Sequence, residues 1–430
     1  MDGLASVAAT QRSARTSLEP IEDKRASRGN HEGRASGAGV DPQPEPDNLG
    51  AQQWDKMRMN VSLAGSYAIN PGRREVRVAL MDTGVDATHP DIAPNLDLFD
   101  SRSFVATEPT IQDLNGHGTW TASAVGAPIN TIGISGVAPR VSLVALKTND
   151  ANGDGDLLAI DEALVYSGDQ HFDIVSTSII GWAELCRGGQ ARKQGCDDAD
   201  YILAQRAVDY ARTRGVFVIA ALGNENRDLS DPRAVGQFLF GLPGGVAEIP
   251  GSLDGVVGVT STGYFNEKAF YSNYGLGVAD VAAPGGDTVF QPAPAPYIGQ
   301  GRVLGAWSST STLAPSDQPL FQTTDGGALY AWVQGTSMAA PNAAGVAALI
   351  VSRYGDFPVR SDRTHLRPDL VERYLEGTAA PQSCPQPRKV TYGLNALYDS
   401  ARCEGDTQSN GFFGHGIVDA VAALTAGTRR

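Results

Sequence analysis

Short apolar, β-branched runs alternate with helical segments along most of this chain. The runs that read as buried strands are residues 76–81, 141–148, 174–179, 216–222, 256–260 and 278–282. Helices are predicted between some of them, at residues 119–127, 157–168 and 199–214. Strands joined through helices form parallel pairs with right-handed crossovers, and each connecting helix packs on a face of the shared sheet. The alternation therefore predicts a three-layer, doubly wound α/β fold. Its sheet is mostly parallel, and helices cover both faces.

One later segment lacks a polar face. Residues 343–351 are Ala, Val, Leu and Ile apart from Gly345, which predicts a helix buried on all sides. The motif Gly-Thr-Ser-Met-Ala-Ala-Pro at 335–341 opens it, with Thr336 as a suitable N-cap. Ser337 is therefore expected at a helix start, where a backbone N–H and the helix dipole favour negative charge. That place suits a nucleophile, although an ordinary capped core helix would show the same pattern.

Composition excludes several partner classes. The chain has 430 residues, of which 41% are hydrophobic and 19% charged, so it can bury a large core. A formal net charge of -14 disfavours nucleic acid and anionic membranes as partners. No apolar run reaches the ~18 to 20 residues of a membrane span, and the N-terminus lacks a secretory-signal pattern. Residues 1–49 are polar and end in a Pro-rich stretch, which predicts a disordered extension before one domain at 50–430.

Two polar motifs stand where the predicted elements meet. Asp82 directly follows the first strand, and His117 precedes an Ala-rich helix within Asn-Gly-His-Gly-Thr. With Ser337, the chain order is Asp, His, Ser, a combination suited to acyl transfer. In that chemistry the imidazole takes the serine proton, and the carboxylate fixes the imidazole tautomer. Each motif alone is weak, but together they indicate a nucleophilic serine enzyme.

These motifs resemble those of subtilisin-like serine proteases, the subtilases. The resemblance covers about residues 52–428. It rests on the segments 82–84, 89–91, 117–119, 136–139, 222–224, 283–285 and 335–341. It implies a subtilisin-like fold with Asp82, His117 and Ser337 as the catalytic triad. It also implies that Asn224 donates to the oxyanion beside the backbone N–H of Ser337.

The resemblance further implies two edges that hold an extended peptide. These are Gly153, Asp154 and Gly155 on one side, and Ser178, Ile179 and Ile180 on the other. Ile180 stands where most relatives have Gly, which predicts a narrowed channel. The primary pocket is expected to be lined by Ala221, Leu222 and Gly223, with Glu225 near its base. An acid there is compatible with a basic or an apolar substrate side chain, and the sequence does not decide between them. Asp154 and Asp156 add negative charge upstream along the cleft, which slightly favours substrates with Lys or Arg.

A calcium ion is expected from the same resemblance. Its ligands would be the Asp91 carboxylate, the Asn130 side chain, and the carbonyls of Pro128, Ile132 and Ile134. Gln52 or Gln53 is a further candidate. Residues 150–161 also fit the EF-hand loop template except for a final Asp. A strand is predicted before that loop instead of a helix, so the EF-hand is the weaker hypothesis.

The four cysteines form two local pairs in sequence, Cys186 with Cys196 and Cys384 with Cys403. Each pair brackets a polar loop that a disulfide would close, so local pairing is predicted, and with it an oxidising compartment. Four free thiols in a cytosolic protein is the alternative.

The sequence as a whole predicts a monomeric, secreted serine endopeptidase that acts on extended peptides and is stabilised by calcium. Two other functions stay open. One is a subtilase-shaped binding or regulatory protein without activity, and the other is a peptide-tailoring transpeptidase. The intact triad pattern disfavours the first, and nothing in the sequence excludes the second.

Overall fold

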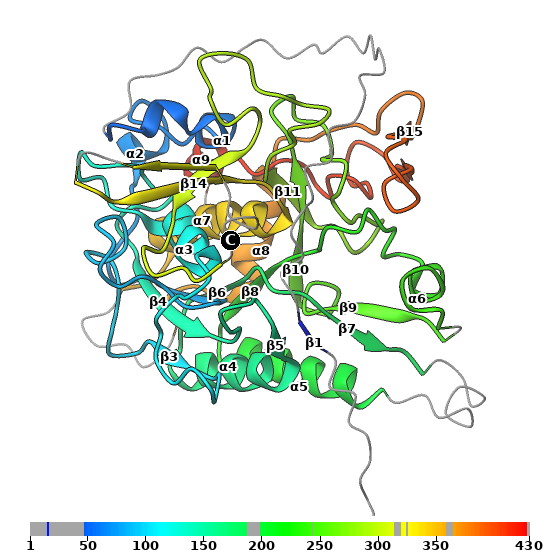
Figure 1. Ribbon diagram of the computed structural model, residues 1–430, viewed down its shortest axis with the longest axis horizontal. Coiled ribbons are helices and arrows are strands. Elements are labelled where there is room, and N and C mark those ends of the chain that lie inside the picture. The colour runs from blue at the N-terminus through cyan, green and yellow to red at the C-terminus, as the bar shows by residue number, and fades with distance from the viewer. Residues whose placement is uncertain are drawn as a thin grey trace, which may run out of the picture.

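A seven-stranded sheet lies at the centre of the computed structural model (Figure 1). The structure describes residues 15–16, 47–186, 198–242, 244–313, 320–323, 326–357 and 364–427. Across the sheet the strands follow the order β11 (Val281–Pro284), β10 (Val256–Thr262), β8 (Phe217–Ala221), β6 (Ile174–Thr177), β2 (Arg77–Asp82), β4 (Ser142–Lys147) and β3 (Arg102–Ser103). All of its neighbouring pairs are parallel. The six predicted strands are thus confirmed.

Both faces of this sheet are buried. Along β2, Val78 and Leu80 pack into one apolar cluster, whereas Ala79 and Met81 pack into another, as the two-residue period of a strand requires. The first cluster holds α3 (His117–Gly126), α7 (Thr336–Tyr354), α8 (Pro368–Thr378) and α9 (Ala420–Thr425). The second holds α4 (Leu157–Asp169) and α5 (Ala199–Thr213), seen below the sheet in Figure 1. The predicted three-layer α/β fold is confirmed.

Helix α7 is buried along nearly its whole length, as predicted. It packs on α3 and on strands β6, β8, β10 and β11, so it crosses the middle of one face of the sheet. Its first turn therefore lies near the carboxyl ends of the central strands. Gly345 permits this close packing, because a Cβ there would overlap the Val137 side chain.

Two long stretches that follow predicted strands carry secondary structure of their own. Residues 227–248 contain α6 (Pro232–Phe240) and most of β9 (Val246–Ile249), and β9 pairs antiparallel with β7 (Gly181–Glu184). Residues 287–330 contribute to an antiparallel sheet in the order β12 (Val303–Ala306), β14 (Leu329–Val333), β13 (Leu320–Thr323). The small elements that remain are η1 (Gly50–Gln52), α1 (Trp54–Arg58), α2 (Ser66–Ile69), β5 (Gly155–Asp156), β15 (Lys389–Thr391) and β16 (Ser400–Arg402).

The predicted N-terminal extension needs correction at two places. Residues 15–16 form strand β1 (Arg15–Thr16), which pairs antiparallel with β5. Asp47 and Leu49 are buried, so the contacts of the domain begin a few residues before the predicted boundary. The Asp47 carboxylate accepts hydrogen bonds from the amides of Asn130 and Thr131, which explains its burial. The rest of residues 1–46 lies outside the described residues.

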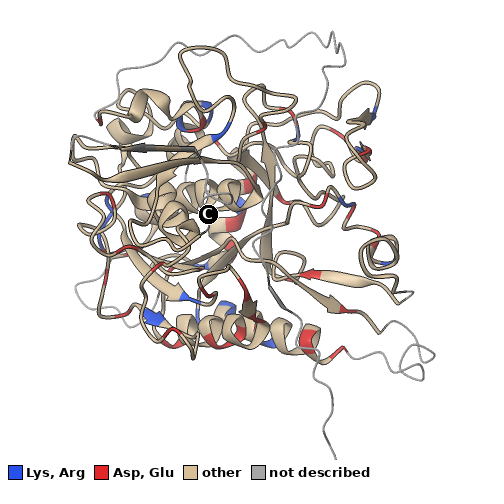
Figure 2. Ribbon diagram, viewed as in Figure 1, with Lys and Arg blue, Asp and Glu red and all other residues tan. Residues whose placement is uncertain are grey.

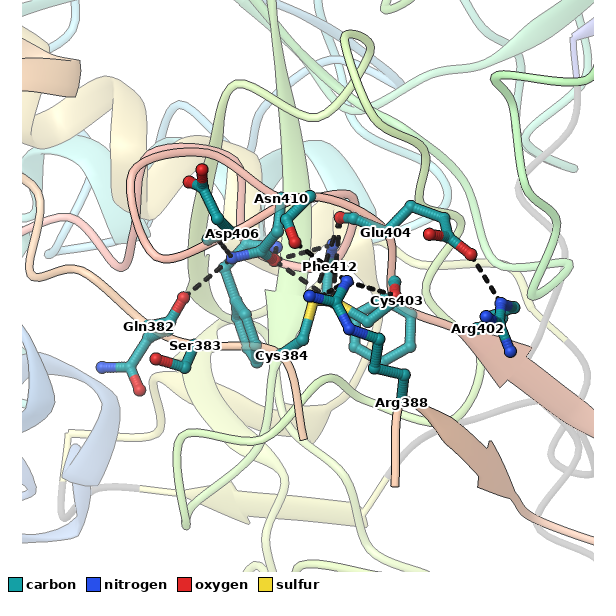
Figure 3. Close-up of a disulfide and its surroundings, with 12 residues drawn as sticks. Gln382, Ser383, Cys384, Arg388, Arg402, Cys403, Glu404, Asp406, Asn410 and Phe412 are labelled. Carbon is teal, nitrogen blue, oxygen red and sulfur yellow. Dashed lines mark hydrogen bonds and ion pairs between the residues drawn. A yellow bond between two sulfur atoms is a disulfide. The ribbon is translucent and has the colours of Figure 1, made fainter. Parts of the chain in front are cut away.

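A disulfide joins Cys384 to Cys403, as predicted, and closes the base of the β15–β16 hairpin (Figure 3). Arg388 lies over this junction and donates to the carbonyls of Cys403 and Gly405. Cys186 is also disulfide-bonded, and Cys196 lies outside the described residues.

Helices α4 and α5 differ in charge. Helix α5 carries charged residues of both signs, whereas every charged residue of α4 is acidic (Figure 2). Within the described ranges, no helix combines the length and apolarity needed to cross a membrane.

Candidate active site

Asp82 is the last residue of β2, in the interior of the sheet, and its side chain is 2% exposed. In open α/β sheets, functional groups collect at the carboxyl ends of the strands. Its Oδ1 accepts hydrogen bonds from the Thr83 amide and from His117 Nδ1, both at 2.7 Å. Its Oδ2 accepts from the Thr121 hydroxyl at 3.0 Å. These contacts hold the carboxylate in one orientation against the imidazole.

His117 begins helix α3, as the sequence indicated. The preceding Gly116 has a φ of 116°, and a Cβ there would overlap the ring of Trp307, so glycine is required at this turn. The Asn115 side chain accepts a hydrogen bond from the His117 amide at 3.2 Å. The imidazole itself is 13% exposed, so it is mostly enclosed but keeps an open edge.

Asp113 is a residue of this site that sequence reasoning missed. It is fully buried, and its carboxylate accepts hydrogen bonds from the amides of Asn115, Gly116 and Thr119. It also accepts from the hydroxyls of Thr83 and Thr119. Burial raises the pKa of this carboxyl, while the bonds to Thr119 and Gly116 oppose the rise. Asp113 thereby fastens the loop after Asp82 to the first turn of α3. The only sequence feature that could have indicated Asp113 is its position, four residues before His117.

Ser337 is the second residue of α7 and is 8% exposed. Its hydroxyl donates to the carbonyl of Ser178 at 3.1 Å, and the Ser178 hydroxyl donates to the Ser337 carbonyl at 2.8 Å. Among the hydrogen bonds of the described residues, none joins Ser337 to His117. The structure therefore brings Asp82 and His117 together, and anchors Ser337 to the predicted substrate edge instead. In free enzymes, bonds between nucleophile and base are often long and tighten when substrate binds.

Asn224 lies just after β8 and contacts the start of α7. Its Oδ1 accepts hydrogen bonds from the amide and the hydroxyl of Thr336 at 2.9 and 3.0 Å. A Cβ added to Gly335 would lie 3.7 Å from both Asn224 Nδ2 and the Ser337 amide nitrogen. These two donors thus border the same space beside Ser337. Both are N–H groups of the kind that can donate to an oxyanion.

The two segments predicted as substrate edges lie next to short strands. Residues 153–155 run into β5, whose Gly155 and Asp156 pair with Thr16 and Arg15 of β1. Strand β1 also lies against β7, which follows directly on residues 178–180. Strand β1 thus pairs with one end of the first segment and contacts the strand that follows the second. The EF-hand hypothesis for residues 150–161 is wrong, because strand β4 and not a helix precedes this loop.

The predicted pocket residues lie at the end of β8. Gly223 donates its amide to the Thr336 hydroxyl at 3.1 Å, so this wall is attached to α7. A Cβ on Gly223 would lie 2.8 Å from both Ile180 Cδ1 and Glu225 Oε2. Ile180 and Glu225 therefore meet over the same glycine. The side chains of Ala221 and Leu222 are fully buried in apolar clusters, so the backbone rather than these side chains can face a ligand.

The predicted calcium ligands are engaged within the protein. Asp91 Oδ1 accepts from Asn130 Nδ2 at 3.0 Å, while Oδ2 accepts from the Ile134 amide at 3.1 Å and the Tyr330 hydroxyl at 2.8 Å. Asn130 Oδ1 accepts from the Ile132 amide at 2.8 Å. Burial raises the pKa of the Asp91 carboxyl to about 6.

The remaining candidate ligands are used as well. The Gln53 side chain pairs with the backbone of Ser135, and Gln52 pairs with Pro296 and Ile298. No group of three or more His, Cys, Asp or Glu side chains placed to hold a metal occurs in the described ranges. With N–H and O–H donors on its oxygens, this donor set does not fit calcium as arranged. Calcium binding stays a prediction from the resemblance.

The sequence of the chain is similar to known proteins. A sequence model described as Subtilase family matches residues 73–416. The chain is 31% identical over 292 residues to M-protease of Shouchella clausii, covering 68% of this chain and 58% of the relative. It is 30% identical over 292 residues to Subtilisin Savinase of Lederbergia lenta, covering 68% and 82%. The chain thus spans somewhat over half of M-protease.

Solved structures share the fold. The epidermin leader peptide processing serine protease of Staphylococcus aureus aligns with a TM-score of 0.68 and 23% identity, over 91% of this chain and 84% of that one. The nisin leader peptidase of Lactococcus lactis aligns with a TM-score of 0.64 and 20% identity, over 88% and 94%. At these identities the likeness supports the fold alone.

Proposed function

The chain belongs to the subtilase family, and on that premise we propose that it is a serine endopeptidase with Asp82, His117 and Ser337 as its triad. The observation that carries the proposal is the 2.7 Å hydrogen bond between the buried Asp82 carboxylate and His117 Nδ1. It fixes the imidazole tautomer, so that Nε2 is the nitrogen left to accept a proton.

In the proposed reaction, His117 Nε2 takes the proton of Ser337 Oγ as this oxygen attacks the scissile carbonyl. The oxyanion that forms accepts hydrogen bonds from the Ser337 amide and Asn224 Nδ2. His117 then returns the proton to the leaving amine, and water releases the acyl group by the reverse sequence. Attack requires the Ser337 hydroxyl to leave its bond to the Ser178 carbonyl, which costs about 1 kcal/mol.

The substrate is proposed to be an extended peptide segment. The pairing of β1 with β5 supports this, because it places an extended backbone on one of the two expected edges. We further propose that the protein acts as a monomer in an oxidising, extracellular setting. The disulfide between Cys384 and Cys403 supports the compartment.

A fluorophosphonate probe tests the nucleophile directly. The wild-type protein should be labelled at Ser337, located by tandem mass spectrometry, and should cleave an unfolded protein substrate. Ser337→Ala should lose both properties. Ser352→Ala is the matched control, because Ser352 lies buried on the same helix with its hydroxyl on the Ala348 carbonyl. A folded wild-type protein that is neither labelled nor active would refute the proposal.

One observation favours a silent, binding-only subtilase as the second candidate, namely the separate hydrogen bonds of His117 and Ser337. The same probe decides this case. Transpeptidation is distinguished from hydrolysis by the product masses obtained from a defined peptide with an added amine.

A further inference from the structure

The side-chain pocket for the substrate residue before the cut is bounded by two walls that both attach to the nucleophile helix. Ser178 exchanges two hydrogen bonds with Ser337, and Gly223 donates its amide to the neighbouring Thr336. Each wall is thus hydrogen-bonded either to Ser337 itself or to the residue before it. On the family resemblance, a side chain adjacent to the scissile bond enters between residues 178–180 and 221–223.

Ile180 narrows this entrance. Its Cδ1 approaches the Gly223 position across the pocket, where a Cβ would come within 2.8 Å. Ile180 is 9% exposed, so its side chain is packed rather than turned to solvent. A slot between an isoleucine and a glycine admits an unbranched chain more readily than an aromatic ring. Lys and Arg have such a chain below their charged groups.

Glu248 lies near both walls of the pocket. It belongs to β9 and pairs with Trp182 of β7, the strand that continues the wall containing Ile180. Its Oε2 also faces the other wall, because a Cβ on Gly251 would lie 2.6 Å from this oxygen, 2.9 Å from Leu222 Cδ2 and 3.1 Å from the Ala221 carbonyl. The carboxylate is therefore close to residues 221 and 222 of the second wall.

This carboxylate has weak partners. Glu248 is 1% exposed. Its carboxylate accepts long hydrogen bonds from the Gly251 amide at 3.4 Å and the Ser252 hydroxyl at 3.3 Å. The salt bridges of the described residues include none to Glu248. A buried carboxylate without a cation is unfavourable. Burial, and to a smaller degree the charge of Glu225, raise the pKa of Glu248 well above its usual range.

We propose that Glu248, aided by Glu225 and by the narrow slot at Ile180, selects substrates with Arg or Lys immediately before the cleaved bond. The inference rests on the proposed endopeptidase function and names its substrate class. A guanidinium or ammonium group supplies the counter-charge that the buried carboxylate lacks, and the methylene stem fills the slot. Glu248 is thus a specificity-determining residue that the sequence did not reveal.

The test uses peptide amides Ala-Ala-Pro-X with a fluorogenic leaving group, where X is Arg, Lys, norleucine or Phe. The leaving group fixes which residue enters the pocket. In parallel, the corresponding peptide acids with X as Arg or norleucine are titrated by calorimetry into the Ser337→Ala variant. The first measurement reports turnover, and the second reports binding without any catalysis.

We expect kcat/KM for Arg or Lys to exceed that for norleucine by at least 100-fold. We also expect the Arg acid to bind at least tenfold more tightly than the norleucine acid. Glu248→Gln should lower both ratios at least tenfold, while Glu184→Gln, which removes the same charge from the neighbouring strand β7, should leave them within twofold. Ile180→Gly should raise kcat/KM for Phe at least tenfold.

Equal or greater activity on norleucine or Phe in the wild type would overturn the inference, as would unchanged ratios in Glu248→Gln. If that variant unfolds, Glu225→Gln should lower the same ratios at least threefold, and no change there overturns the inference. A labelled, active enzyme without basic preference refutes the pocket assignment alone. Selective binding of the Arg acid by a chain that is never labelled supports the pocket and refutes the proposed catalysis.

Discussion

At the scale of single residues, the site depends on side chains that are held by several partners. Asp82 and Asp113 are buried and receive hydrogen bonds from the loops around them, so neither can turn away. Asn224 is held through its oxygen by Thr336, which leaves the Nδ2 group for a ligand. In Asp82, Oδ2 is held by Thr121 while Oδ1 faces His117. In Asn224, Oδ1 is held by Thr336 while Nδ2 is the donor proposed for the oxyanion.

Asn224→Asp separates these two tasks. The variant keeps an acceptor for Thr336 but replaces the Nδ2 donor by an oxygen, so the oxyanion loses one hydrogen bond. We expect kcat to fall about 100- to 1,000-fold with little change in KM, because the lost contact exists mainly in the transition state. Steady-state kinetics on a peptide amide measures this.

Circular dichroism and the melting temperature serve as controls for Asn224→Asp, and both should stay close to the wild type. A loss of activity below fivefold in a folded variant would show that Asn224 does not stabilise the oxyanion.

At the scale of elements, strand β14 contacts Asp91, the residue that the family resemblance names as a calcium ligand. Its Tyr330 hydroxyl reaches Asp91 Oδ2, and Gly133 beside it has no room for a side chain, since a Cβ would overlap Tyr330. Tyr330 is therefore linked to the loop at residues 128–134 through Asp91, which also accepts from Asn130 and Ile134. Elements far apart in sequence, β14 and the loop after α3, stabilise each other here.

Metal removal tests this arrangement. We expect an excess of chelator to change the melting temperature by less than about 2 °C, because the Asp91 oxygens already have protein donors. Tyr330→Phe should lower the free energy of unfolding by about 1 to 3 kcal/mol, since a buried acceptor loses its partner.

Tyr297→Phe is the comparison for Tyr330→Phe, because the Tyr297 hydroxyl is 3.9 Å from the Met57 sulfur, a weak contact. A large fall of the melting temperature in chelator, restored by added calcium, would support the calcium prediction and contradict the closure by Tyr330.

At the scale of the whole molecule, strand β1 lies on an edge that we propose for the substrate. Strand β1 pairs with β5, and a peptide substrate on the same edge would need the same backbone groups. Deleting residues 1–46 keeps Asp47, which holds the loop at residues 130–135. We expect the truncated enzyme to show a KM at least threefold lower at an unchanged kcat.

The point variant Thr16→Pro provides a second measurement in the full chain, because proline removes the amide that a strand can donate. Like the truncation, this variant should lower KM. Equal KM values for all three proteins, together with equal melting temperatures, would show that β1 does not obstruct the cleft.

Much of the architecture could be predicted from local patterns. The runs that became β2, β4, β6, β8, β10 and β11 are apolar on both sides, which only a sheet covered on two faces can accommodate. Ser337 and His117 begin helices, and Asp82 ends a strand, as their flanking residues indicated. The pairing of Cys384 with Cys403 followed from their closeness in sequence.

The sequence by itself thus determined the strands, the helices and the places of the three chemical motifs, because periodicity and capping act over a few residues. Only the tertiary structure decided that Glu248 of β9 pairs with Trp182 of β7, that Tyr330 reaches Asp91, and that Ser337 bonds to Ser178 rather than to His117. These contacts join segments tens to hundreds of residues apart. Their partners are chosen by how the layers and insertions pack, and no local pattern in the chain encodes that choice.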